Sequence, residues 1–173
     1  YGKKLSIIHC MLALPLFFAA CKSENNTPPA AFTALTADQT GLQFANNLQA
    51  SRDFNLFRYM YFYNGAGVGA GDFNNDGLID LFFAANQAQD RLYINKGDCR
   101  FEDVTEKAKI PDDGGWSTGV SVVDINNDGL LDIYVCRVAQ YEVLKGRNQL
   151  LICTGIDENG IPTYVDSAEA YGL

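Results

Sequence analysis

Oxygen-bearing side chains alternate with other residues in the stretch D-F-N-N-D-G-L-I-D, which runs from Asp72 to Asp80. Within these nine residues the candidate ligands are Asp72, Asn74, Asp76 and Asp80. Gly77 lies where a chain that folds around a central point needs a backbone conformation that other residues resist. Calcium binds about six to eight oxygen ligands at roughly 2.3–2.6 Å, so alternate carboxylates and amides must converge on one point. The stretch therefore predicts a calcium loop.

The same pattern returns 52 residues later (124 minus 72) as D-I-N-N-D-G-L-L-D. The candidate ligands of this second loop are Asp124, Asn126, Asp128 and Asp132. In each loop we expect the main-chain carbonyl of the seventh residue, Leu78 or Leu130, to add a ligand and water to complete the shell. The flanking segments G-V-G-A-G-D and G-V-S-V-V-D also match. Two copies with matching flanks indicate a structural repeat.

An EF-hand begins with the same spacing, but it needs a bidentate Glu at loop position 12 and a helix on each side. Position 12 counted from Asp72 is Phe83, and the chain after Asp80 reads L-F-F-A-A, which favours a buried strand. We therefore expect each loop to close at its ninth residue and to join two strands. A metal-free acidic turn, the remaining alternative, would leave the like charges of the recurring aspartates uncompensated.

At these residues the chain resembles the FG-GAP or VCBS repeat family, whose calcium-binding β-propeller blades also occur in integrin α-subunits and in cartilage acidic protein-like proteins. Both loops follow the family pattern D-x-[DN]-x-D-G-x-x-D, and the resemblance extends roughly from Phe32 to Leu173. It implies an all-β fold of propeller blades with four antiparallel strands each. The chain would hold about two blades and one outer strand, as the N-terminal fragment of a protein with about seven blades.

The expected strands follow from short apolar runs between turn residues. We expect the first repeat at residues 64–110, with strands at 67–73, 81–85, 92–95 and 101–105. The second repeat is expected at 115–173, with strands at 119–123, 133–136, 150–153 and 163–166. Residues 32–63 would hold the outer strand, which begins at Phe32, and a long connection between blades. An insertion at 137–149 is either a variable surface loop or a loop that sets specificity.

The N-terminus predicts export. Lys3 and Lys4 precede an apolar run that ends at Ala20, which is typical of a signal peptide at residues 1–20 and too short and interrupted for a membrane span. The residues F-A-A-C that end at Cys21 resemble a bacterial lipobox, in which Cys21 would be lipidated; cleavage with an unmodified Cys21 is the alternative. Residues 21–31 are expected to be a flexible tether. We therefore expect a lipid anchor at the bacterial outer membrane or cell surface.

Composition excludes several functions. The formal net charge is −8, and this acidic balance argues against nucleic-acid binding, which needs Lys and Arg to replace phosphate counterions. The only histidine, His9, lies in the predicted signal peptide, so the mature segment has no His-based catalysis or His-ligated zinc. Paired carboxylates can hydrolyse glycosides, but the aspartates here have metal-ligand spacing. We therefore expect no enzyme activity in this segment.

Two further features leave alternatives open. The cysteines after Cys21 are Cys99, Cys136 and Cys153; we expect free thiols, with a disulfide between Cys136 and Cys153 as the alternative. Trp116 and the aromatic residues within 59–63 either pack between blades or line a carbohydrate or protein site.

The leading hypothesis is a calcium-stabilised, surface-anchored propeller module for extracellular binding or adhesion, with an unidentified protein or carbohydrate partner. The alternative is the non-catalytic propeller part of a larger secreted hydrolase or lyase, because propellers of this family also occur in such enzymes.

Overall fold

The computed structural model describes residues 31–139, 144 and 146–173. The chain divides into two compact units, Tyr1–Ala34 and Leu35–Leu173. The predicted signal peptide, Cys21 and nearly all of the predicted tether lie outside the described residues, as do positions 140–143 and 145 of the predicted insertion. Within the described part of the chain, no helix has the length and apolar character to cross a membrane.

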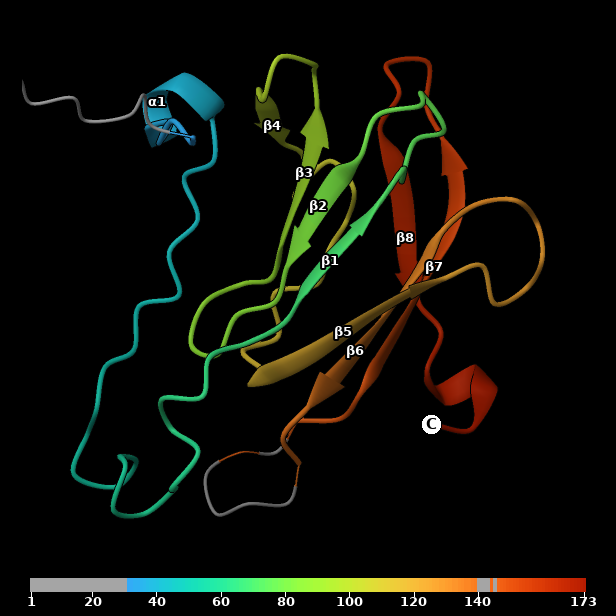
Figure 1. Cartoon of the computed structure of the whole chain (residues 1–173). Coiled ribbons are helices and arrows are strands. Elements are labelled where there is room, and N and C mark those ends of the chain that lie inside the picture. Colours follow the sequence, from blue (N-terminus) through green and yellow to red (C-terminus); the bar gives the residue numbers. More distant parts are fainter. Residues whose placement is uncertain (1–30, 140–143, 145) are drawn as a thin grey trace, which may run out of the picture. The chain divides into compact units, whose positions relative to one another are not determined.

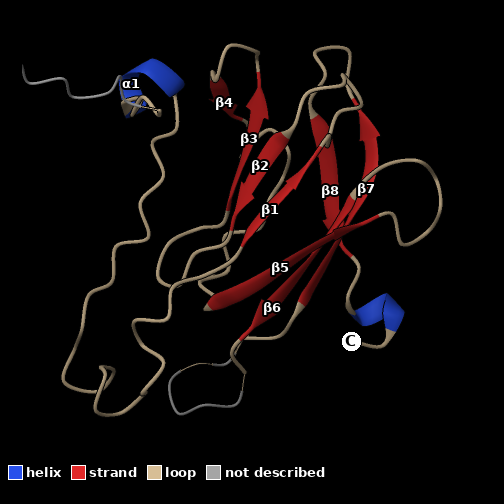
Figure 2. Ribbon diagram, viewed as in Figure 1, coloured by secondary structure: helices blue, strands red, loops and turns tan. Residues whose placement is uncertain are grey.

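Two four-stranded antiparallel sheets make up the second unit (Figure 1). The first sheet contains β1 (Val68–Gly71), β2 (Asp80–Phe83), β3 (Arg91–Asn95) and β4 (Phe101–Asp103). The second contains β5 (Ser117–Val123), β6 (Asp132–Arg137), β7 (Gln149–Ile156) and β8 (Pro162–Asp166). Consecutive strands pair in both sheets, which is the strand order of a propeller blade (Figure 2). The predicted all-β class, with four antiparallel strands in each repeat, is confirmed.

Both acidic loops lie at equivalent hairpins of the two sheets. Gly71 pairs with Asp80 at the end of the β1–β2 hairpin, and Val123 pairs with Asp132 at the end of the β5–β6 hairpin. The predicted closure of each loop at its ninth residue is therefore confirmed, and a strand rather than a helix follows it.

Glycines in β1 allow the second sheet to approach the first closely. A Cβ on Gly69 would lie 2.8 Å from Cγ atoms of Val120 and Val122 in β5, a distance at which two carbon atoms clash. The side chains of both sheets form a single core between them. Its fully buried members include Phe82, Leu92, Ile94, Ile133, Val135 and Leu151. Removal of this apolar surface from water is the main force that holds the sheets together.

The outer strand predicted at Phe32 is wrong. Phe32 is 91% exposed, and residues 32–36 form no strand. The short helix α1 (Ala37–Thr40) follows instead: Thr36 caps its first turn through a capping box with Gln39, and Gly41 ends it with φ of 78°. The sequence contains this signal, a Thr followed three residues later by Gln and then by Gly. The capping box therefore starts a helix at Ala37, directly after the segment that forms no strand.

The predicted connection between blades carries a buried aromatic cluster. It consists of Phe54, Tyr59 and Phe62 from this segment and Trp116 from the connection between the sheets. The rings of Phe54 and Trp116 meet edge to face, with centroids 4.9 Å apart and an interplanar angle of 89°. Trp116 is 3% exposed. Trp116 thus packs within this cluster, whereas Tyr61 and Tyr63 are exposed on the surface.

The cysteines of the second sheet are not bridged. Cys136 in β6 and Cys153 in β7 are both free, and so is Cys99. Cys136 is exposed while Cys153 is buried in the core. The prediction of free thiols is therefore confirmed for these three cysteines.

A buried ion network joins the two sheets. Arg137, at the end of β6, pairs with Asp90 of the β2–β3 turn at 3.5 Å and also with Asp113. Ser117 of β5 accepts from Arg137 Nε at 3.2 Å and donates to Asp90 at 2.9 Å. A Cβ on Gly115 would lie 2.6 Å from the guanidinium, so only glycine leaves room for it. Burial raises the pKa of Asp90, while Ser117 and Arg137 act in the opposite direction.

Removal of Arg137 should cost more stability than removal of an ordinary surface ion pair. Arg137→Ala leaves two carboxylates without their cation, one of them buried, and should lower the free energy of unfolding by about 3–5 kcal/mol. Arg91→Ala, which removes a half-exposed pair with Asp103, should cost no more than about 1 kcal/mol. Urea unfolding of both variants tests this, and equal losses would contradict a stabilising role for the buried network.

Candidate functional site

The first acidic loop folds around its own main-chain N–H groups. The N–H of Asp76 donates to Asp72 Oδ1 at 3.0 Å and to Asn74 Oδ1 at 3.2 Å. The next N–H, from Gly77, donates to Asp72 Oδ2 at 2.8 Å. The side-chain oxygens of loop positions one and three therefore lie within reach of one point. The Asp76 carboxylate accepts from Leu78 N at 2.8 Å and from the Asn74 amide at 3.0 Å.

The second loop repeats this geometry residue by residue. The N–H of Asp128 donates to Asp124 Oδ1 and to Asn126 Oδ1, both at 3.1 Å, and Gly129 donates to Asp124 Oδ2 at 2.9 Å. Asp128 Oδ1 accepts from Leu130 N at 2.9 Å.

Both loops also share an unusual backbone. Asn75 and Asn127 at loop position four have φ of 56° and 59°, and Gly77 and Gly129 have φ of 87° and 86°. These left-handed conformations explain why Asn and Gly stand there.

The last aspartate of each loop has a different environment from the others. Asp80 is fully buried, and its two oxygens accept from Phe73 N and Asn95 N, each at 2.8 Å. Asp132 is also fully buried and accepts from Ile125 N at 3.0 Å and Cys153 N at 2.8 Å. Each carboxylate thus joins the start of its loop to the third strand of its sheet.

Asp80 lies close enough to the other loop carboxylates to sense their charge. Burial is the largest cause that raises the pKa of Asp80, and the nearby carboxylates of Asp76 and Asp72 raise it further. The hydrogen bonds from Asn95 and Phe73 act in the opposite direction. Like charges therefore gather in the loop, which is the situation that a bound cation relieves.

The candidate ligands are of the chemical type that a hard cation prefers. Every candidate side-chain ligand offers an oxygen, from Asp72, Asn74, Asp76 and Asp80 in one loop and Asp124, Asn126, Asp128 and Asp132 in the other. Among the described residues, however, no three Asp, Glu, His or Cys side chains gather into a cluster that could hold a metal by themselves. Several loop carboxylate oxygens face main-chain N–H groups instead. The Asn oxygens and the carbonyls of Leu78 and Leu130 would have to contribute, and their role as ligands stays a prediction.

The two loops contact each other across the sheets. Asn75 of the first loop donates to the carbonyl of Gly129 in the second at 3.2 Å. Asn74 donates to the carbonyl of Gly160 in the β7–β8 turn at 3.1 Å. These contacts link residues far apart in the sequence. While the Asn74 amide nitrogen donates to Gly160, the Asn74 side-chain oxygen accepts from Asp76 N within the first loop.

Sequence reasoning missed a second pair of hairpin contacts that both repeats share. Asp90 Oδ1 accepts from Ala85 N at 2.7 Å in the first sheet, and Asn148 Oδ1 accepts from Arg137 N at 2.9 Å in the second. Asp90 and Asn148 each stand directly before the third strand. The sequence contains a signal for these contacts: in both repeats a polar residue with a side-chain acceptor stands directly before the third strand.

Comparison with known proteins supports the repeat. Residues 72–135, which include both loops, match a family model described as an FG-GAP-like repeat. Over 123 residues the chain is 28% identical to cartilage acidic protein 1 of Xenopus tropicalis, in an alignment that covers 68% of this chain and 18% of that protein. The chain therefore spans less than a fifth of the length of this curated relative. Together the matches support an FG-GAP repeat architecture for this part of the chain.

The ninth loop residue should be needed for folding even when no calcium is present. Asp80→Ala leaves one buried and one partly buried main-chain donor without this partner, at about 1–3 kcal/mol each, and should lower the free energy of unfolding by about 2–5 kcal/mol. Asp76→Ala, at an exposed position, should cost less than about 1.5 kcal/mol under the same conditions.

Urea unfolding in the presence of a chelator measures both values. Asp80→Asn is the matched control, because its remaining oxygen can still accept one of the two hydrogen bonds. If Asp80→Ala and Asp76→Ala lose the same stability, Asp80 has no separate structural role.

Proposed function

We propose that this chain is a calcium-stabilised propeller module of an exported, surface-anchored protein that binds an extracellular partner. The observation that carries the proposal is the repeated convergence of the first and third side-chain oxygens in both loops, on Asp76 N in one and on Asp128 N in the other. An acidic turn without a cation gives no reason for the same arrangement to occur twice.

In the first loop, Ca²⁺ would be held by the side chains of Asp72, Asn74, Asp76 and Asp80 and by the carbonyl of Leu78. In the second loop the corresponding ligands are Asp124, Asn126, Asp128, Asp132 and Leu130. The positive charge of the ion would offset the mutual repulsion of the three carboxylates in each loop. Exported proteins meet abundant calcium, so weak sites would remain filled and serve stability rather than signalling.

The chain's own residues support a folding role for the metal. The buried Asp80 and Asp132 carboxylates already tie each loop to its sheet, so a cation bound to the loop would act directly on the blade. Since Asn75 joins the first loop to the second, order in one loop would also favour order in the other. A binding module needs such rigid loops on a stable scaffold.

Calcium should therefore raise the stability of the intact protein. A ligand that binds only the folded state stabilises it by RT ln(1 + [L]/Kd), about 2.7 kcal/mol per site at a hundredfold excess over Kd. Thermal unfolding with millimolar calcium and with chelator measures the effect. We expect a lower Tm with chelator and a smaller calcium response in Asp76→Ala and in Asp128→Ala.

Magnesium at the same concentration is the control for ionic strength, and Asp98→Ala controls for the loss of an acidic residue outside the loops. Identical melting curves with calcium and with chelator would refute the metal assignment for both loops.

We further propose that the protein is anchored to a membrane through lipid on Cys21. The support is the order of charged, apolar and small residues before Cys21 in the sequence, together with the surface location that FG-GAP repeats suggest. Cys21→Ser should move the protein from the membrane fraction to the soluble exported fraction. Cys99→Ser is the matched control, because Cys99 is an exposed free thiol far from the N-terminus. Membrane association that survives Cys21→Ser would contradict the anchor.

A further inference from the structure

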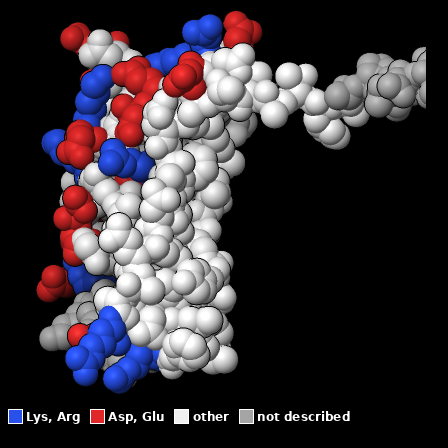
Figure 3. Space-filling model, turned by 90° about the vertical axis from the view of Figure 1, so that its left-hand side faces the viewer, with Lys and Arg blue, Asp and Glu red and all other residues white. Residues whose placement is uncertain are grey.

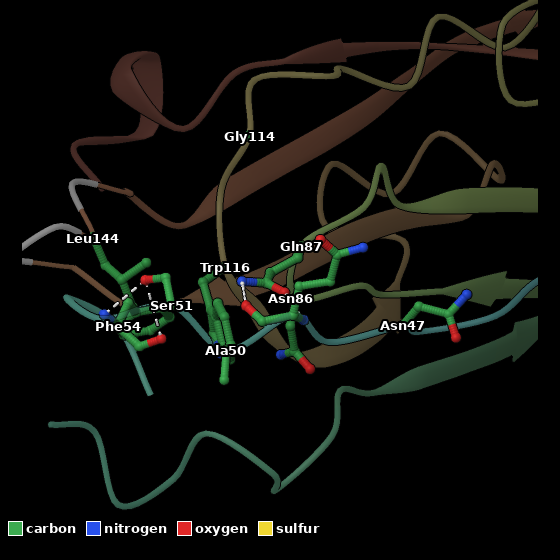
Figure 4. A pocket seen from close by; sticks show the side chains of 10 residues that line it. Asn47, Ala50, Ser51, Phe54, Asn86, Gln87, Gly114, Trp116 and Leu144 are labelled. Atoms are coloured by element: carbon green, nitrogen blue, oxygen red, sulfur yellow. Dashed lines mark hydrogen bonds between the residues drawn. The ribbon is translucent and has the colours of Figure 1, made fainter. Parts of the chain in front are cut away.

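A cavity of about 630 Å³ opens between the segment before β1, the β2–β3 turn and the connection between the two sheets. Figure 4 shows Trp116 in the middle, the carboxamides of Asn86 and Gln87 on one side and Ser51 and Phe54 on the other. The cavity lies apart from the acidic loops, since none of its lining residues belongs to them. Neither the family match nor the calcium hypothesis accounts for it.

Two of the polar side chains that line this cavity are held in place before any ligand arrives. Gln87 is fixed by the main chain of Gln49, whose N–H donates to Gln87 Oε1 at 2.6 Å and whose carbonyl accepts from Gln87 Nε2 at 3.2 Å. The Asn86 amide donates to the carbonyls of Ser117 at 2.8 Å and Gly65 at 3.2 Å. A rigid wall reduces the entropy that a bound ligand costs.

Two side chains at the mouth remain available for a ligand. Asn47 and Gln49 are exposed, and no hydrogen bond of the Asn47 or Gln49 carboxamide to another described residue is present. A carboxamide both donates and accepts hydrogen bonds. Trp116 and Phe54, which are 3% and 7% exposed, also line the cavity, but little of either ring is open to a ligand.

The cavity carries no formal charge. None of its lining residues is Asp, Glu, Lys or Arg, and the chain from Gln39 to Ser51 has no charged residue at all. Figure 3 shows a broad uncharged area on one face of the molecule, with charged side chains mainly toward one edge and the two ends. A ligand with a formal charge would lose hydration here without a partner of opposite sign.

We propose that this cavity binds a neutral saccharide, with Asn47 and Gln49 as the side chains that recognise its hydroxyl groups. Paired hydroxyls act as donors and acceptors at once, as carboxamides do, and a neutral sugar needs no partner of opposite charge in this uncharged lining. An extended peptide fits less well, because the cavity is lined by loops and offers no free strand edge for main-chain pairing. The proposal rests on the proposed binding function and names its ligand class.

The single tryptophan of the chain makes the test direct. Because Trp116 is the only Trp in the sequence and lines the cavity, its fluorescence reports on occupancy. The intact protein is titrated in calcium with D-glucose, D-galactose, N-acetyl-D-glucosamine, maltose and cellobiose, and calorimetry measures the same mixtures. We expect at least one of these sugars to give a saturable fluorescence change with a matching calorimetric Kd.

Variants locate the binding. Asn47→Ala and Gln49→Ala remove exposed carboxamides, so they should leave the fold intact while each weakens binding roughly tenfold, as expected for a lost hydrogen bond of about 1.4 kcal/mol. Ala50→Leu places a larger side chain in the cavity and should abolish binding. Gln43→Ala, an exposed carboxamide outside this cavity, is the matched control and should bind as the unaltered protein does.

The outcomes separate this proposal from the calcium proposal. No sugar binding in a protein whose Tm still responds to calcium overturns the saccharide site alone. Sugar binding that is unchanged in Asn47→Ala, Gln49→Ala and Ala50→Leu places the sugar elsewhere and also overturns it. A saturable signal from a neutral glycine-rich peptide and none from the sugars would assign the cavity to peptide instead.

Discussion

A buried carboxylate that accepts two main-chain hydrogen bonds is the constraint on which each sheet depends. Asp80 and Asp132 are fully buried, and each joins the first residues of its loop to the third strand of its sheet. Without these acceptors four main-chain N–H groups, two of them in buried hydrogen bonds, would lack these partners, which would destabilise each hairpin. The ninth residue of each acidic loop therefore has a structural role that does not depend on a metal.

The remaining carboxylates have a looser relation to the fold. Asp72 and Asp124 accept hydrogen bonds within the loop, while Asp76 and Asp128 are exposed. Such exposed like charges cost stability unless a cation or solvent screens them. The motif therefore divides its acids between two environments: the buried acids fix the geometry of the hairpin, and the exposed acids carry the charge.

The junction between the sheets combines apolar packing with a few polar groups. Gly69 lets β5 approach β1, and the Arg137 network crosses from the second sheet to the first. Next to this network the aromatic cluster around Trp116 supports the walls of the uncharged cavity. Gln149 at the same junction donates to Asp113, but its buried Oε1 has no hydrogen-bond partner among the described residues. The junction thus serves stability on one side and offers a cavity for a ligand on the other.

The sequence alone determined the strands and the place of the acidic loops, because alternating apolar residues, turn glycines and a repeated nine-residue pattern are local signals. It also contained the capping box of α1, although we predicted no helix there. Only the tertiary structure decided which groups meet across the sheets: Arg137 with Asp90, Asn75 with Gly129, and Asn86 with Ser117. Ser117 and Asp90, which also meet, are 27 residues apart, and the other partners are farther apart still. No local periodicity of the sequence encodes such pairs, because they follow from how one sheet packs on the other.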